Sequence, residues 1–131
     1  MREVRFTVYG KVRGKARPRV TKHGTFTPKE TREYERHIAD AYREKGCEPF
    51  LGEVSVEVTT YRQLPESRPK KCIREPDTYK PDVDNIGKIV LDALNGVAYL
   101  DDKQVTMLYV DKRPRTRIPQ EFIEVTISEV D

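Results

Sequence analysis

The sequence predicts an α+β domain in which two helices pack on one face of a small mixed β-sheet. Three observations support this fold class. Apolar residues alternate with polar ones in four short segments, as in half-buried strands, and in two other segments they recur on one side of a helix. The segments follow the order strand, helix, strand, helix, strand, strand. The length of 131 residues is that of one domain, so we expect a single domain over residues 1–131.

The first predicted strand covers residues 2–12, because Val4, Phe6 and Val8 alternate with polar residues. A basic segment rich in turn-forming residues follows at residues 14–25. Its composition predicts either a strand–loop–strand excursion or a mobile arm.

The first helix is predicted to begin near Thr27, where three residues favour a helix start. Thr27 can cap the helix, Pro28 suits the first helical position, and Glu30 completes a capping box. Gly46 marks the expected end of the helix. One face of this segment is apolar and carries Tyr34, Ile38, Ala41 and Tyr42.

The second predicted strand contains Val54, Val56 and Val58 and leads to Tyr61. The next segment, residues 63–80, contains several prolines and clustered charges. It predicts a long exposed loop, which can be disordered in the absence of a ligand. Because long loops in compact domains are often functional, this loop is a candidate interaction segment.

The second helix is predicted to begin at Asp82 or Asp84 and to end at Asn95-Gly96, where a left-handed cap can stop it. Its apolar stripe consists of Val83, Ile86, Val90 and Leu94. Two further strands are predicted at residues 105–109 and 122–127. A basic turn is predicted between them, at residues 112–117.

Positive charge is concentrated in two segments, although the formal net charge is only +3. Residues 11–22 hold six Lys and Arg side chains and no acid, and residues 62–80 hold six more. Basic arms beside an acidic pocket suit a metal-dependent enzyme that acts on a polyanion. The alternative is that these side chains only keep a soluble domain dispersed.

The balance of apolar and charged residues bears on the oligomeric state. Each class accounts for 36% of the chain, so the hydrophobic core should be thin. A thin core favours a second copy of the chain that covers one face of the domain. We therefore expect a homodimer.

The two cysteines, Cys47 and Cys72, lie far apart and show neither zinc-site spacing nor a disulfide framework. They are predicted to be free thiols of a cytosolic protein. The N-terminus has no apolar signal core, and no apolar run is long enough to span a bilayer. We expect a cytoplasmic protein without a membrane partner.

Three aspartates and a lysine form the strongest candidate site. Asp82 and Asp84 stand at the start of the second helix, Lys88 lies one turn further on, and Asp102 follows the helix. Acidic side chains that converge can hold a hard cation such as Mg²⁺, and a nearby lysine can neutralise a phosphate oxygen. Asp102 can reach the other two acids only if the chain folds back along the sheet after the helix.

Structural roles can also explain each of these residues. Asp84 is a preferred helix cap, Lys88 can pair with an acid four residues away, and the acidic pair after the helix can form a turn. A calcium-binding loop is excluded, because Ile86 occupies a ligand position and Ala93 stands where the bidentate Glu belongs.

Five short motifs carry a family resemblance. They are KPDVDNIGK, LDALNG and DDKQV at residues 80–88, 91–96 and 101–105, with GKARPR at 14–19 and TFTP at 25–28. Together these motifs resemble the RusA family of Holliday junction resolvases, which are crossover junction endodeoxyribonucleases of bacteria and their phages.

The resemblance implies a homodimer that cuts four-way DNA junctions in recombination and repair, for a host or a prophage. It places the catalytic acids at Asp82, Asp84 and Asp102 and the catalytic lysine at Lys88. The three acids would bind Mg²⁺, for which Mn²⁺ can substitute. The side chains expected to follow the DNA phosphates are Lys15, Arg17, Arg19, Lys22, Lys70, Lys71 and Arg74.

Two other functions fit the same residues. A non-catalytic DNA-binding or architectural protein would use the acids as caps and turns. A metal nuclease that acts on flaps or other branched DNA would share the site, and only the resemblance favours the junction as substrate.

Overall fold

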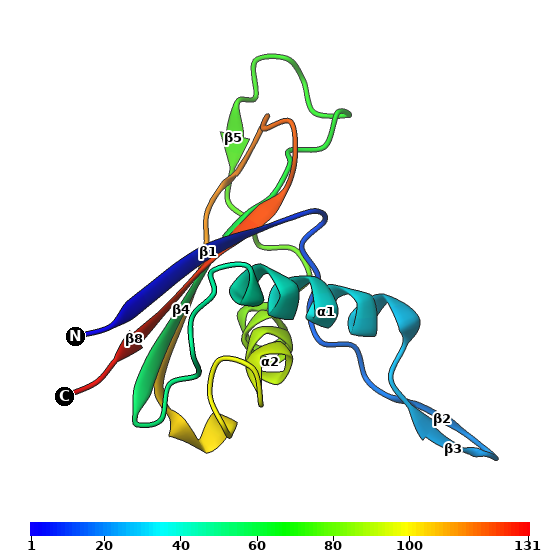
Figure 1. Ribbon diagram of the computed structural model, residues 1–131. Helices are drawn as coiled ribbons and strands as arrows, with labels where there is room; N and C mark the ends of the chain where they lie inside the picture. The colour runs from blue at the N-terminus through cyan, green and yellow to red at the C-terminus, as the bar shows by residue number, and fades with distance from the viewer.

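Four strands form a mixed sheet, and two helices lie on one of its faces (Figure 1). The computed structural model describes residues 1–131, except for the side chain of Arg19. In spatial order the strands are β1 (Glu3–Tyr9), β8 (Phe122–Glu129), β4 (Val54–Tyr61) and β6 (Val105–Lys112). The helices are α1 (Lys29–Arg43) and α2 (Val83–Leu94). This arrangement confirms the predicted α+β class.

The connection through α2 explains the mixed character of the sheet. β4 and β6 run parallel, whereas β8 is antiparallel to both of its neighbours, β1 and β4. A parallel pair needs a crossover connection, which the segment containing α2 provides. The helix packs closely on the edge strand β6, since a Cβ atom on Gly87 would lie 2.8 Å from Cδ2 of Leu108. A glycine at this position therefore permits the close approach.

The hydrophobic core lies between the sheet and the helices. Val54, Val56 and Val58 on β4 are buried, whereas Glu57 between them is exposed. This alternation confirms the predicted period of two. The largest fully buried side chains outside the sheet are Ile38, Tyr42, Phe50, Ile86, Ile89, Leu94 and Tyr99.

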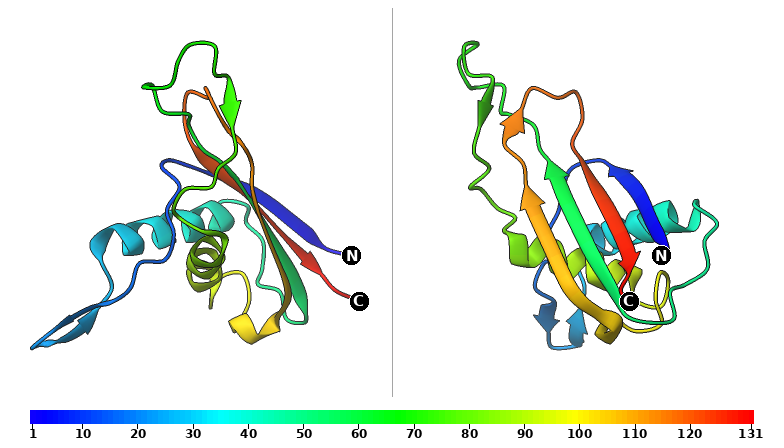
Figure 2. Two further views of the ribbon diagram at one scale, coloured as in Figure 1. Left: turned by 180° about the vertical axis from the view of Figure 1, so that it is seen from behind. Right: turned by 90° about the vertical axis from the view of Figure 1, so that its left-hand side faces the viewer.

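The opposite face of the sheet is not covered by a helix (Figure 2). Alternate strand residues point to this face, and Arg5, Glu57 and Glu124 are among them. This face is mixed, because the aromatic side chains Tyr9, Tyr61 and Phe122 also cluster on it.

Two predicted element boundaries are wrong. β1 ends at Tyr9 and not near residue 12, because the chain leaves the sheet and the Val12 N–H donates to the Glu121 carboxylate at 3.0 Å. α1 begins at Lys29 with Pro28 at the N-cap position, and no side chain caps the helix. The predicted capping box does not form, because the Pro28 carbonyl already accepts the first helical bond, from Arg32 N–H at 3.2 Å.

The second helix confirms the first of its two predicted starts. Asp82 is the N-cap residue of α2, and the helix ends at Leu94, directly before the predicted stop. Asn95 is extended, and Gly96 takes the positive φ of 76°.

The basic segment at residues 14–25 contains a short hairpin, as one of the two predictions had it. β2 (Arg19–Thr21) pairs with β3 (Gly24–Phe26), and this hairpin projects from the body beyond the start of α1 (Figure 1).

Residues 63–80 form a largely exposed loop, as predicted, but the loop contains one short strand that was not predicted. β5 (Arg74–Glu75) pairs with β7 (Arg115–Thr116), and together they form a finger that projects from the sheet (Figure 1). Arginines hold the finger together. Arg68 binds Glu75 at 3.0 Å, and Arg117 donates hydrogen bonds to three backbone carbonyls of residues 68–72. No local sequence pattern predicts hydrogen bonds and ion pairs between segments so far apart in the chain.

Candidate active site

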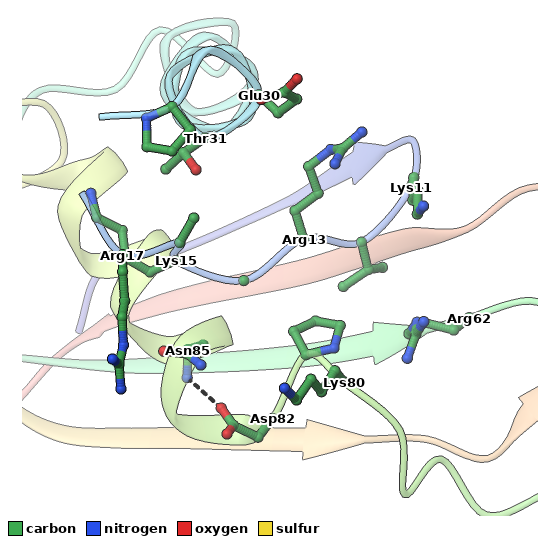
Figure 3. Close-up of a pocket in the computed structure, with 15 residues that line it drawn as sticks. Lys11, Arg13, Lys15, Arg17, Glu30, Thr31, Arg62, Lys80, Asp82 and Asn85 are labelled. Atoms are coloured by element: carbon green, nitrogen blue, oxygen red, sulfur yellow. Dashed lines mark hydrogen bonds between the residues drawn. The ribbon is translucent and has the colours of Figure 1, made fainter. Parts of the chain in front are cut away.

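Asp82 lies where the chain enters α2. Its backbone is extended, and its Oδ1 accepts a hydrogen bond from the Asn85 N–H at 3.0 Å (Figure 3). This bond caps the helix. The other carboxylate oxygen has no protein partner within the described residues, and the side chain is exposed. Asp82 can therefore cap α2 and offer an oxygen to a ligand at the same time.

Asp84 and Lys88 lie one turn apart on the surface of α2. The Asp84 carboxylate is 4.0 Å from the Lys88 ammonium, and their side chains are 75% and 63% exposed. An exposed pair of this kind contributes less than about 1 kcal/mol to stability. Both charges thus remain available to a ligand, and the structure brings Asp82, Asp84 and Lys88 together at the start of α2.

Asp102 lies at the opposite end of the helix. It begins η1 (Asp102–Gln104), and its N–H donates to Oδ1 of Asn95, the residue after α2, at 3.1 Å. A helix of 12 residues is about 18 Å long at 1.5 Å per residue. Among the described side chains, no group of three or more His, Cys, Asp or Glu is placed to hold a metal ion.

A short capping network keeps Asp102 at this end. Asp101 and Gln104 form a capping box around η1, and the Gln104 amide also donates to the carbonyls of Phe50 and Gly52, both at 2.9 Å. These bonds tie the turn after α2 to the segment before β4. The chain therefore does not fold back to bring Asp102 to the other acids within one copy.

A cationic hollow of about 1130 Å³ opens beside Asp82 (Figure 3). The residues 11–17, the start of α1, the end of β4 and the residues before α2 form its walls. The positively charged side chains that line it are Lys11, Arg13, Lys15, Arg17, Arg62 and Lys80, and the acids are Glu30 and Asp82.

The residues 11–17 are closely packed on the start of α2. The Lys15 N–H donates to the Asn85 carbonyl at 2.8 Å. At Gly14, a Cβ atom would lie 2.7 Å from Cβ of Pro81 and 2.9 Å from Cβ of Asn85, so any side chain would force these segments apart. The glycine of the GKARPR motif thus allows the basic segment to lie beside the acids.

Lys15, predicted to bind DNA, makes contacts within the chain. Its ammonium lies 3.0 Å from both Glu35 of α1 and Asp92 of α2. Burial lowers the pKa of Lys15, but the hydrogen bonds to the two carboxylates outweigh that effect and raise its pKa above the usual value. Lys15 therefore connects the two helices, and its charge is largely neutralised.

The other residues predicted to bind DNA lie on the projecting parts of the molecule. Arg17 is exposed at the hollow, and Lys22 is exposed in the hairpin. Lys70, Lys71 and Arg74 are exposed on the finger. Arg19 begins β2, but its side chain lies outside the described part of the structure.

Four lining cations were not among the predicted site residues. Lys11 and Arg13 belong to the basic run at residues 11–22, and Lys80 belongs to the KPDVDNIGK motif, so the sequence held a signal for each. Arg62 belongs to the second basic segment, residues 62–80, and the turn of the chain after β4 brings it to the hollow.

The profile of the family described as Endodeoxyribonuclease RusA matches residues 10–128, which is nearly the whole chain. The chain belongs to the RusA family. This result confirms the resemblance read from the motifs, and it assigns the protein to a family of endodeoxyribonucleases, which hydrolyse phosphodiester bonds within DNA.

A relative in Bacillus subtilis (strain 168), the uncharacterized protein YqaN, is 34% identical over 145 aligned residues. The match covers 97% of this chain and 96% of the relative, so the two chains align over nearly their whole length. None of the described helices is long and apolar enough to cross a membrane.

Proposed function

We propose that the chain is a metal-dependent endodeoxyribonuclease that resolves four-way (Holliday) DNA junctions by paired, symmetric cuts in recombination and repair. The observation that carries this proposal is the placement of Asp82, Asp84 and Lys88 at the start of α2, where Asp82 lines the cationic hollow. Membership in the RusA family supports it, because these residues form the motif that resembles the resolvases.

The donor set fits a hard divalent cation. Asp82, Asp84 and Asp102 are exposed and offer only carboxylate oxygens, which Mg²⁺ and Mn²⁺ prefer over sulfur or nitrogen. We infer that these three acids would hold Mg²⁺, with Mn²⁺ as a substitute. Such a cation, when bound, lowers the pKa of a water molecule and polarises the phosphate. The Lys88 ammonium would neutralise charge that develops on the leaving oxygen.

The separation of the acids along α2 supports a homodimer. One copy of the chain has Asp82 and Asp84 at the start of the helix and Asp102 beyond its end. In a two-fold dimer in which the two copies of α2 run in opposite directions, the start of one helix faces the end of the other. Asp102 of the partner subunit would then complete the site formed by Asp82 and Asp84.

The edge strand β6 offers a surface for such a contact. β6 is the last strand of the sheet, so its outer edge has unpaired backbone groups. Met107, Leu108 and Tyr109 on this strand are exposed, unlike most large apolar side chains of the sheet. Val83 is also exposed and lies one turn before Gly87, which packs against Leu108. Val83 and Leu108 lie on the helix side of this edge, whereas Met107 and Tyr109 lie on the other side, and we call these four residues the edge patch.

The exposed cations of the hairpin and the finger would follow DNA phosphates on either side of the site. Such contacts release counterions, so the affinity should fall steeply with salt. With six to ten phosphate contacts, the loss between 50 and 200 mM salt would be about 10³–10⁵-fold. An affinity that does not respond to salt would contradict this part of the proposal.

Cleavage of a labelled, immobile four-way junction tests the proposed function, with linear duplex and flap DNA as comparisons. We expect symmetric nicks on the junction in Mg²⁺ or Mn²⁺ and none in EDTA. Preferential cutting of flaps would identify a nuclease of other branched DNA. Binding without cutting in either metal would favour a non-catalytic DNA-binding protein, in which the acids are caps and turns.

A further inference from the structure

The lining of the hollow contains cations that have no acidic partner. Among the described side chains, no carboxylate lies within 4.0 Å of the charged groups of Lys11, Arg13, Arg17 or Lys80. In the finger, by contrast, Arg68 and Arg115 both bind Glu75, although Lys70, Lys71 and Arg74 are exposed there. Like charges along one surface repel one another, so a bound anion would stabilise this arrangement.

Two helices begin at the wall of the same hollow. Pro28 and Thr31 of the first turn of α1, and Asp82 and Asn85 of α2, are among its lining residues. The first turn of α1 has no side-chain cap, which leaves its backbone N–H groups free for another acceptor. The partial positive charge of the helix start adds to that of the four side chains, and Glu30 of the same turn offsets part of it.

The shape and chemistry of the hollow indicate which anion fits. Arg13 is half-buried in the wall, so a duplex, whose two backbones lie on a convex surface, would not bring a phosphate to it. A single strand can enter a concave site of this kind. The lining residues include no aromatic side chain on which a base could stack. Contacts to phosphates would therefore dominate over contacts to bases.

We propose that the hollow is a binding site for a single DNA strand, which it holds by the phosphates through Lys11, Arg13 and Lys80 so that the strand passes Asp82. This inference rests on the proposed function and adds to it the part of the substrate that enters the site. At a junction, strands leave one duplex and enter another, so an unpaired stretch would be available near the branch point. Recognition in the hollow would be independent of sequence.

Binding of a fluorescein-labelled oligothymidylate, followed by fluorescence anisotropy in EDTA, tests the site without cleavage. We expect Arg13→Gln and Lys80→Gln each to weaken single-strand binding about tenfold, which is the loss of one charge-assisted hydrogen bond. Each should also reduce the slope of log K against log salt by about 0.7. The affinity for duplex DNA should change less than about twofold, because the exposed cations of the hairpin and the finger are unaltered in these variants.

Lys45→Gln is the matched control, because Lys45 is exposed after α1 and does not line the hollow. It should leave single-strand binding unchanged, and Arg13→Lys should retain most of it. Thermal unfolding followed by circular dichroism verifies that each variant is folded. Wild-type affinity in both hollow variants would overturn the proposal, as would an equal loss in Lys45→Gln. If the wild-type chain binds the oligonucleotide as expected but never cuts junctions, the proposed function fails and the strand site stands.

Discussion

The two ends of α2 both present exposed acids, but their surroundings differ. At the start of the helix, Asp84 pairs with Lys88, and Asp82 lines the cationic hollow. At the far end, Asp102 lies in a framework of hydrogen bonds built by Asn95, Gln104 and the neighbouring Asp101 carboxylate. One end thus has the cations and two acids, whereas the other end has the third acid. Each end holds only part of the predicted site.

The largest expected effect concerns the start of the helix. We expect Asp84→Asn to reduce junction cleavage at least about 10³-fold, because a neutral amide is a poor ligand for Mg²⁺. Junction binding, measured by gel shift in EDTA, should be unchanged. Asp40→Asn, which alters an exposed acid of α1, is the control and should cut normally. Normal cleavage by Asp84→Asn would show that Asp84 has no catalytic role and serves only the first turn of α2.

Lys88 tests whether the exposed ion pair serves catalysis or only the helix. Lys88→Ala should reduce the cleavage rate about 10²–10³-fold, because the charge on the leaving oxygen loses its neutralising partner. The free energy of unfolding should fall by less than about 0.5 kcal/mol, as for other exposed helix pairs. Single-turnover kinetics and urea unfolding measure the two quantities. A full cleavage rate would leave Lys88 as a structural partner of Asp84.

The edge patch tests the contact that would join the two ends. Leu108→Asp should weaken dimerisation at least about tenfold, because it places an unpaired charge in an apolar interface, and cleavage should fall with it. Sedimentation velocity measures the oligomeric state. Leu51→Asp is the control, because Leu51 is equally apolar and 79% exposed but lies outside the edge patch. A wild-type sedimentation profile in Leu108→Asp would exclude this surface as the dimer contact.

Mixing two inactive variants distinguishes a shared site from a site within one chain. Asp84→Asn and Asp102→Asn should each be inactive alone. In a mixture that exchanges subunits, the heterodimer would combine an intact Asp84 with an intact Asp102 at one of its two sites. In an equal mixture of two-fold dimers, about a quarter of the sites should then be active. Because a heterodimer has only one active site, it should nick one strand of the junction and not two. No recovery after verified subunit exchange would show that the three acids do not act across the dimer.

The smallest expected effect is on stability. Asp82→Ala should lower the free energy of unfolding by about 1 kcal/mol, because it removes the bond to the Asn85 N–H. Asp102→Ala should change it by less than about 0.5 kcal/mol, since no hydrogen bond to its side chain is present among the described residues. Urea unfolding of the two variants compares the ends of α2 directly. Equal losses would contradict the distinction between a capping and a non-capping acid.

Local patterns in the sequence predicted most of the secondary structure. The alternation of valines in β4 and the apolar stripe of α2 report directly which side of each element is buried. The cap of α1 was mispredicted, because the helix begins one residue later than expected, which moves Thr27 and Glu30 out of the two positions that a capping box requires. The finger was missed, because a two-residue strand has no periodicity of its own. Its order depends on arginines from the distant residues 115–117.

The sequence by itself determined the family, the fold class and the identity of the acidic and basic motifs, because these follow from residue types and short spacings. Only the tertiary structure decided which of these residues lie together. The packing of Gly14 on Pro81 and Asn85 brought the basic segment to the first acids, and the network around Gln104 held Asp102 at the far end of α2. Distances between segments depend on how the whole chain packs, and no local pattern encodes them.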